Sequence, residues 1–337
     1  MTVCLTGLGV YTPDRVVTGA DIAAESDIPE DVITEKMGVR EKHVCPPEDD
    51  HVTDMCVAAA ADALDDAAVD PDDLDVVLYH GSEYKDYVVW SAAADVAERV
   101  GARDAYATES YTLCAGAPIA LRQVRAQLQT GDVDSALLVA ASREEDLVDY
   151  GDDDASFMFN FGSGASAFVL ERDAGDRTRA VVHESAAVTD GSFSRDVVMP
   201  AGGSEHPPSE QTVAEGMHTL TVTSEDMKER MADVSAPNFL SVADDALAAS
   251  GLTRDDVDFA AITHMKRSFH EYLAGELGLD DDGHHYLDEY GHVQSVDQAL
   301  ALNEALADGD VEAGDVVLFL AAGTGYTWSA TVLEWRD

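Results

Sequence analysis

Short apolar runs alternate with longer amphipathic stretches along the whole chain. Runs such as 2–10, 74–79 and 135–141 have the length of buried strands, and turn residues bound them. The stretches 52–68 and 115–128 carry apolar residues at helical intervals or are rich in alanine. Strands that alternate with helices in this way predict an α/β fold with parallel or mixed sheets.

The second half of the chain weakly repeats the pattern of the first half. The apolar block 315–321 repeats the block 135–141, and a glycine-led segment follows in both halves. The polar segment 173–179 lies at the join. We therefore expect two duplicated α/β halves, residues 1–172 and residues 178–337.

Two further segments of the second half have clear local patterns. Residues 239–250 carry an apolar face at helical spacing and predict a helix. Residues 201–211 contain two prolines and two glycines, which predicts a loop inserted between regular elements.

Composition places the chain among folded proteins with an extreme acidic surface. The 337 residues are 46% hydrophobic, and 67 acidic against 20 basic residues give a formal charge of −47. The acidic residues are spread along the chain, which suits a surface adapted to high salt, where screening removes self-repulsion. This charge argues against nucleic acid and anionic membranes as partners. A basic protein partner is the competing explanation and would require one dense acidic face.

The cysteine spacing and the hydropathy of the chain indicate its cellular compartment and whether it binds a metal. The four cysteines are widely spaced, and neither CxxC pairs nor Cys/His pairs at zinc spacing occur. The sequence has no signal peptide and no apolar run of about 18 residues. We expect a cytoplasmic protein without a metal site.

The segment 107–122 is the strongest candidate for chemistry. A short apolar lead-in and a small-residue turn precede a helix, so Cys114 stands where the helix begins. Unpaired N–H groups and the positive dipole end favour a thiolate there. Cys114 is therefore a candidate nucleophile, although a free cysteine is commonly inert packing.

Two histidines and a glycine pair end other elements and could converge on Cys114. His264 follows a predicted strand, where side chains project from the carboxyl edge of a sheet. His292 lies in a glycine turn before a helix, and Gly323-Thr-Gly325 can bring backbone N–H groups close to a substrate. A thiolate, imidazoles and an N–H nest are the groups that acyl transfer from a thioester needs. Each histidine could equally be an ordinary turn residue.

The ordered set of motifs resembles β-ketoacyl-acyl-carrier-protein synthase III of the thiolase-like superfamily, over almost the whole chain. The segments that carry the resemblance are Thr6-Gly-Leu-Gly-Val-Tyr-Thr-Pro13, Lys36-Met-Gly-Val-Arg40, Leu113-Cys-Ala-Gly-Ala117, Phe161-Gly-Ser-Gly-Ala165, Thr263-His264, Tyr290-Gly291 and Gly325-Tyr-Thr-Trp328.

The resemblance implies a five-layer αβαβα fold made of two thiolase-like halves, and a homodimer. It implies that a cysteine takes an acyl group from coenzyme A. A malonyl thioester then decarboxylates, and its carbanion attacks the acyl-enzyme to give a 3-oxoacyl thioester. Coenzyme A and acyl-carrier-protein thioesters would be substrates, so no cofactor is expected, and an acyl carrier protein becomes a candidate partner.

Carried over by position, the resemblance makes Cys114 the nucleophile and His264 one of two residues over the malonyl carbonyl. The N–H groups of Cys114 and Gly325 would form the oxyanion hole. Lys36 stands where the family has an arginine near the nucleotide of coenzyme A, which keeps the charge but loses the planar fork.

Three other residues are candidates for substrate contacts. Lys266 and Arg267, just past His264, could meet a phosphate of phosphopantetheine or simply balance nearby carboxylates. Trp90 lies where the family shapes the acyl pocket across its dimer, and could instead belong to the dimer core.

The main departure from the family is His292, which stands in place of asparagine. Histidine can still donate a hydrogen bond to an enolate oxygen, but it can also act as a base. Gln294 is a spare amide donor two residues on. The departure leaves open a second enzymatic function, acyl transfer to an oxygen or nitrogen nucleophile without decarboxylation.

Two further alternatives remain. Glu83 lies in roughly the region where the related hydroxymethylglutaryl-coenzyme A synthases place a general acid, which would make the reaction a different condensation. A solvated surface residue is the ordinary interpretation of such a glutamate. A non-catalytic thiolase-like scaffold that binds acyl-coenzyme A would need neither Cys114 nor His264.

Overall fold

The structure, a computed structural model, describes residues 1–337, the side chain of Asp153 excepted. Its main strands form one nine-stranded mixed sheet in the order β11-β12-β13-β8-β1-β7-β6-β4-β5. These strands are β1 (Val3–Tyr11), β4 (Val76–Tyr79), β5 (Tyr106–Glu109), β6 (Ser135–Ser142), β7 (Gly164–Arg172), β8 (Ala180–Thr189), β11 (Phe259–Ile262), β12 (Val316–Gly323) and β13 (Thr327–Trp335). Two small sheets pair β2 (Val16–Thr18) with β3 (Glu41–His43) and β9 (Val197–Val198) with β10 (Thr221–Val222).

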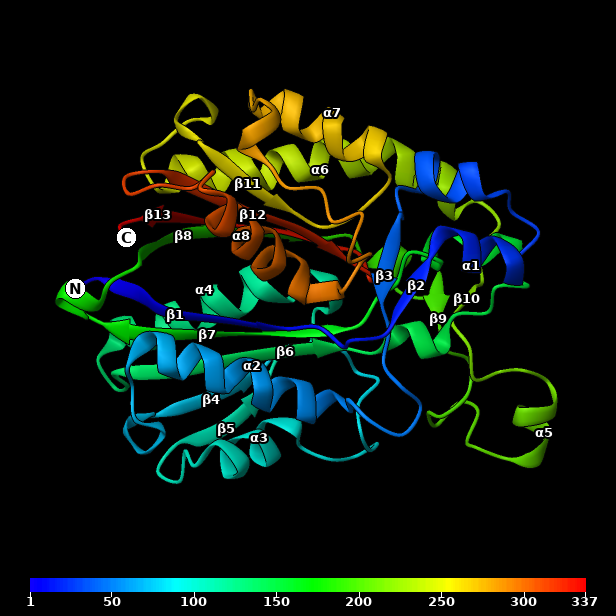
Figure 1. Ribbon diagram of the computed structural model, residues 1–337, viewed down its shortest axis with the longest axis horizontal. Coiled ribbons are helices and arrows are strands. Elements are labelled where there is room, and N and C mark those ends of the chain that lie inside the picture. Colours follow the sequence, from blue (N-terminus) through cyan, green and yellow to red (C-terminus); the bar gives the residue numbers. More distant parts are fainter.

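Helices cover both outer faces of the sheet and fill the space between its two halves (Figure 1). They are α1 (Gly19–Glu25), α2 (Val52–Ala67), α3 (Ala92–Val100), α4 (Gly116–Thr130), α5 (Glu210–Ala214), α6 (Met227–Ala249), α7 (Arg267–Leu277) and α8 (Asp297–Asp308). A π-helix, Val32–Met37, precedes β3.

Three apolar clusters separate five layers, in the order helices, strands, helices, strands, helices. One core joins α2 and α3 to the face formed by β4, β6 and β7, and another joins α6 and α7 to β11, β12 and β13. The central core buries α4 and α8 between the two halves of the sheet, where Phe168 and Phe319 meet with ring centroids 6.0 Å apart. The prediction of a thiolase-like αβαβα fold is confirmed.

The two halves of the sheet meet through a short antiparallel contact. Cys4 and Leu5 of β1 pair with Val181 and Ala180 of β8. Strands from residues 3–172 lie on one side of this contact, and strands from residues 180–335 lie on the other. The division into two duplicated domains, 1–172 and 178–337, stays a prediction.

Most expected elements are present, with two differences. The helix predicted over 239–250 already begins at Met227. The sequence prediction missed its first three turns because they are more polar and contain Pro237, which obscures the apolar periodicity. The loop predicted over 201–211 ends earlier than expected, because Ser209 caps α5 through a hydrogen bond from the N–H of Thr212. Among the described residues, no helix combines the length and apolar character needed to cross a membrane.

Glycines on β1 allow the strand to lie directly against α2. A Cβ atom on Gly9 would lie 2.1 Å from the carbonyl oxygen of Ala59, and one on Gly7 would lie 2.1 Å from that of Ala63. We predict that Gly9→Ala destabilises the protein by about 2 kcal/mol or more, because backbone must move to relieve the clash. Denaturant unfolding in molar salt measures the change.

Gly275→Ala is the matched control, because Gly275 lies inside α7 and an added Cβ would meet nothing within 4 Å. We expect this variant to be as stable as the wild type or more stable, by up to about 1 kcal/mol. Equal effects of the two substitutions would contradict the close-packing account.

Candidate active site

Cys114 lies on a 3₁₀ turn, Leu113–Ala115, that leads directly into α4. Its side chain is buried but lines a cavity of about 870 Å³. Leu113 adopts a φ of 49°, in the left-handed region, so the chain turns sharply just before the thiol. The prediction that this cysteine stands at the start of a helix is confirmed, and the helix dipole there favours negative charge.

His292 reaches the thiol from the loop before α8. Its Nε2 lies 3.1 Å from Sγ of Cys114. The backbone N–H of His292 donates to the carbonyl of Asn160 at 2.7 Å, and its carbonyl accepts from the N–H of Gly162 at 2.9 Å. A Cβ on Gly291, which has a φ of 72°, would lie 2.3 Å from the Asn160 oxygen. Glycines in both segments therefore let the two loops pack backbone against backbone.

A buried lysine fixes the same loop from the other side. Nζ of Lys42, on β3, donates to the carbonyls of Phe159 at 2.9 Å and Phe161 at 2.6 Å. Burial lowers the pKa of Lys42 to about 8, although the charge of Glu145 opposes that shift. The ring of Phe161 contacts the His292 imidazole edge-on, so the lysine fixes the position of the histidine through this loop.

His264 follows β11 and is buried against the ring of Tyr286. Neither of its ring nitrogens has a hydrogen-bond partner among the described residues. Burial lowers the pKa of His264 well below its ordinary value, and the positive charges of His292, His270 and Arg267 lower it further. The imidazole is therefore neutral and retains one N–H for a ligand.

Asp297, the first residue of α8, connects the two histidines. Its Oδ2 lies 2.6 Å from Nδ1 of His292 and accepts the backbone N–H of His264 at 2.7 Å. Its Oδ1 accepts the N–H of Val293 at 2.7 Å, and the side chain has no exposed area.

The electrostatic environments of the two histidines differ. Burial alone would lower the pKa of His292, but the charges of Asp297 and Cys114, together with hydrogen bonds to both, raise it well above its ordinary value. One imidazole is thus suited to hold a proton beside the thiol, whereas His264 stays neutral. Environments that separate two like groups in this way are typical of acid–base assignments in active sites.

The hairpin between β12 and β13 approaches the thiol loop closely. A Cβ on Gly323 would lie 2.4 Å from the carbonyl oxygen of Thr112 and 2.9 Å from the backbone nitrogen of Cys114. Gly325, with a φ of 135°, lies in the turn of this hairpin, and its neighbour Thr324 lines the cavity. The structure therefore brings the two predicted oxyanion-hole segments to one place.

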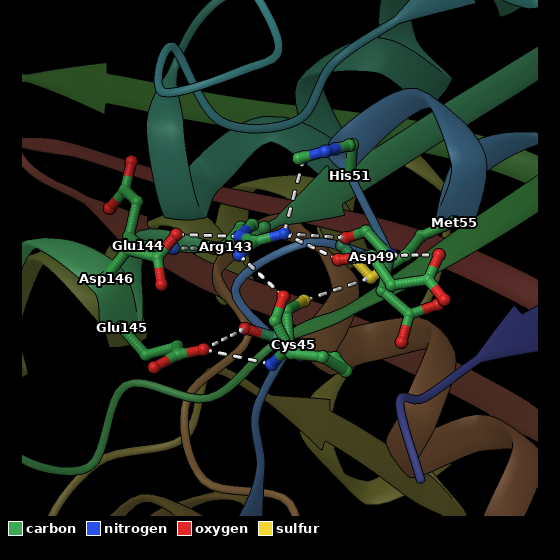
Figure 2. Close-up of polar contacts among 12 residues, drawn as sticks. Cys45, Asp49, His51, Met55, Arg143, Glu144, Glu145 and Asp146 are labelled. Carbon is green, nitrogen blue, oxygen red and sulfur yellow. Dashed lines mark hydrogen bonds and ion pairs between the residues drawn. The ribbon is translucent and has the colours of Figure 1, made fainter. Parts of the chain in front are cut away.

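Arg143 lines the cavity, and Figure 2 shows the polar contacts that hold it in place. Its guanidinium donates to the carbonyls of Pro46 and Asp49 and to the carboxylate of Asp146, at 2.7–2.9 Å. Because these bonds use its donors, Arg143 supports the wall and is poorly placed to bind a substrate phosphate.

A second buried carboxyl group, that of Glu144, lies in the same wall. Ser82 donates to its Oε1 at 2.6 Å. Burial raises the pKa of Glu144, against the lowering effects of Ser82, His292 and Gln294. Gln294 lines the cavity with a φ of 56°. Glu144 and Asp297 were not among the residues predicted from sequence, since an acidic residue after a strand or at a helix start is usually a solvated or capping group.

The other predicted residues lie at different places. Glu83 is exposed and lines the cavity, whereas Trp90 packs edge-on against Tyr87, which is itself part of the cavity wall. Lys36 and Lys266 are exposed and are not part of the described cavity lining.

Arg267 already has partners within the chain. It pairs with Asp288 at 2.6 Å, and its guanidinium lies over the Tyr286 ring. The roles of Lys36, Lys266, Arg267, Trp90 and Glu83 stay predictions. All four cysteines are free, and within the described part of the chain no group of three or more His, Cys, Asp or Glu is arranged to hold a metal ion.

Comparisons with known proteins agree with this architecture. The family model "3-Oxoacyl-[acyl-carrier-protein (ACP)] synthase III" matches residues 109–191, and the model of its C-terminal part matches residues 247–335. Together the two span just over half of the chain. The β-ketoacyl-[acyl-carrier-protein] synthase III of Desulfitobacterium hafniense (strain Y51) is 29% identical, with 99% of this chain and 98% of that protein aligned. The corresponding protein of Caldanaerobacter subterraneus is 28% identical over 98% of this chain and 96% of its own length.

Solved structures show the same fold. The 3-oxoacyl-[acyl-carrier-protein] synthase III from Aquifex aeolicus superposes with a TM-score of 0.84 at 23% identity, covering 99% of this chain and 100% of the other. The priming β-ketosynthase of the R1128 polyketide pathway gives 0.86 at 24% identity, covering 100% and 97%. A variant of OleA from Xanthomonas campestris, solved with bound lauric acid and lauroyl-CoA, gives 0.83 at 16% identity, covering 99% of both chains.

Proposed function

Because the chain belongs to the 3-oxoacyl-[acyl-carrier-protein] synthase III family, we propose that it is an acyltransferase that forms an acyl-enzyme on Cys114. The acyl group is then condensed with a malonyl-type thioester to give a 3-oxoacyl thioester. The observation that carries the proposal is the thiol of Cys114, in the wall of a large cavity and 3.1 Å from Nε2 of His292, which shares Asp297 with His264.

The first half-reaction moves the acyl group to the enzyme. Sγ of Cys114 gives its proton to Nε2 of His292 and attacks the carbonyl carbon of an acyl thioester. The tetrahedral oxyanion is stabilised by the N–H groups of Cys114 and Gly325, and the tetrahedral intermediate collapses with cleavage of the bond to the departing thiolate. His292 returns the proton to that thiolate, so coenzyme A or a carrier-protein thiol leaves in neutral form.

The second half-reaction forms the carbon–carbon bond. The bond between the malonyl carboxylate and its α-carbon breaks, carbon dioxide leaves, and the electron pair becomes an enolate. The single N–H of neutral His264 donates to the enolate oxygen. The α-carbon then attacks the acyl carbonyl, and the Cys114 thiolate is expelled as the 3-oxoacyl thioester forms.

His292 sets this chain apart from the pattern expected of its family, in which asparagine occupies the position. We propose that the histidine serves both half-reactions. It is first a base toward Cys114; its Nε2 then takes up one proton from solvent, donates to the malonyl carbonyl, and faces the Cys114 thiolate again when that thiolate is expelled. Its pairing with Asp297 also favours a second candidate function, acyl transfer to an oxygen or nitrogen nucleophile, since an imidazole paired with a carboxylate is an effective base. Product analysis with malonyl-coenzyme A separates the two.

The setting of the enzyme is likewise proposed from sequence. A homodimer, a cytoplasmic location and function in high salt follow from the resemblance and from the charge of −47. An acyl carrier protein is the proposed second partner beside acyl-coenzyme A. Assays are therefore designed in molar salt, where screening reduces self-repulsion.

We predict that incubation with a panel of acyl-coenzyme A thioesters adds one acyl mass to the wild type and none to Cys114→Ala. Intact-protein mass spectrometry makes the measurement, and the mass of the adduct identifies the donor. Cys45→Ala is the matched control, because Cys45, drawn in Figure 2, is also a buried free thiol but is not part of the described cavity lining. An adduct that persists in Cys114→Ala would show that Cys114 is not the nucleophile.

We predict that His264→Ala still acylates Cys114 but forms 3-oxoacyl product about 100-fold more slowly or worse, because the enolate loses its donor. Acyl adduct and carbon dioxide release from malonyl-coenzyme A are followed in the same samples. His183→Ala, which removes a partly exposed histidine paired with Glu334, serves as the control. Equal loss of both half-reactions would show that His264 does not act on the enolate.

A further inference from the structure

A single buried carboxylate, that of Asp297, contacts both histidines of the site. The side chain of Asp297 has no exposed area and accepts hydrogen bonds from the backbone N–H groups of His264 and Val293. Its remaining short contact, 2.6 Å, is to Nδ1 of His292. A carboxylate acceptor at that distance requires a proton on Nδ1, which fixes Nε2 as the nitrogen that faces the thiol.

The charges around His292 come from several elements. Asp297 faces it from α8 and Cys114 from the turn before α4, while His264 and Glu144 approach from the ends of β11 and β6. A buried carboxylate is stable only with a charged or hydrogen-bonded partner. His264 is neutral, so the imidazole of His292 is the group that can carry the balancing positive charge.

We propose that Asp297 is a positioning residue that keeps His292 doubly protonated beside a Cys114 thiolate, and so prepares the nucleophile before any thioester binds. The proton of Sγ moves to Nε2, the proton on Nδ1 stays in the hydrogen bond to Oδ2, and the net charge of the group is unchanged. The same carboxylate accepts the backbone N–H of His264. The Asp297 side chain therefore sets the charge of His292 and the position of His264. The catalytic meaning of this arrangement rests on the proposed acyl transfer.

The test measures the thiolate directly, without a thioester. The rate at which iodoacetamide modifies Cys114 is measured by peptide mass spectrometry from pH 5 to pH 10. We expect the wild type to be alkylated faster than Asp297→Asn at neutral pH. Asp297→Asn should shift the midpoint upward by about two pH units, toward the value near 8.5 of a free thiol. At a pH well below both midpoints, this shift is a rate loss of about 100-fold.

Asp75→Asn is the matched control, because Asp75 also accepts two backbone N–H groups, those of Asp134 and Ser135, far from the thiol in the fold. We expect its midpoint to equal that of the wild type. A merely structural role for Asp297 would lower the rate at every pH and leave the midpoint in place, and that result would overturn the proposal.

His292→Asn is a second, independent test of whether Asp297 acts on Cys114 through His292. If Asp297 acts through His292, the midpoint rises in His292→Asn and does not rise further in the double variant with Asp297→Asn. An unchanged midpoint in His292→Asn overturns the proposal even if Asp297→Asn fails to fold. Alkylation needs no thioester, so the two proposals can fail separately. A low midpoint without any acyl adduct would contradict the proposed function and leave the role of Asp297 standing. An acyl adduct with an ordinary midpoint would contradict the role of Asp297 and leave the proposed function standing.

Discussion

The contact between Asp297 and His292 is the constraint on which the site depends. Cys114 comes from the first half of the chain, and both histidines and Asp297 come from the second. They meet because the turn Leu113–Ala115 before α4 contacts the turn Gln294–Val296 before α8, and both helices are buried in the central core between the two halves of the sheet. The fold thus brings the thiol and its base together at the ends of elements far apart in sequence.

Burial gives two chemically identical side chains different states. His264 is buried, and the positive charges of His292, His270 and Arg267 further lower its pKa, so it stays neutral. His292 is equally buried, yet the Asp297 carboxylate and the thiol beside it overcome the cost of desolvation. In the proposed mechanism the two states serve different steps, because His292 moves a proton to and from sulfur while His264 donates a hydrogen bond to an enolate.

Much of the fold, and the position of Cys114 at the start of a helix, could be predicted from the sequence for identifiable physical reasons. Buried strands and amphipathic helices have distinct periods, and the glycines that allow close backbone contact, such as Gly291 and Gly323, are conspicuous. Asp297 could not be singled out, because an aspartate at the start of a helix is equally typical of an ordinary cap. The protonation states of His264 and His292 depend on burial and on neighbours from other elements, which no local pattern contains.

The charge state of the two imidazoles is the most direct test of the account. Nitrogen-15 NMR of protein labelled in histidine, with His264 and His292 assigned through substitution of each, reports which ring nitrogens carry protons at neutral pH. We expect both nitrogens of His292, and only one nitrogen of His264, to be protonated. A neutral His292 would contradict the account, as would a positively charged His264.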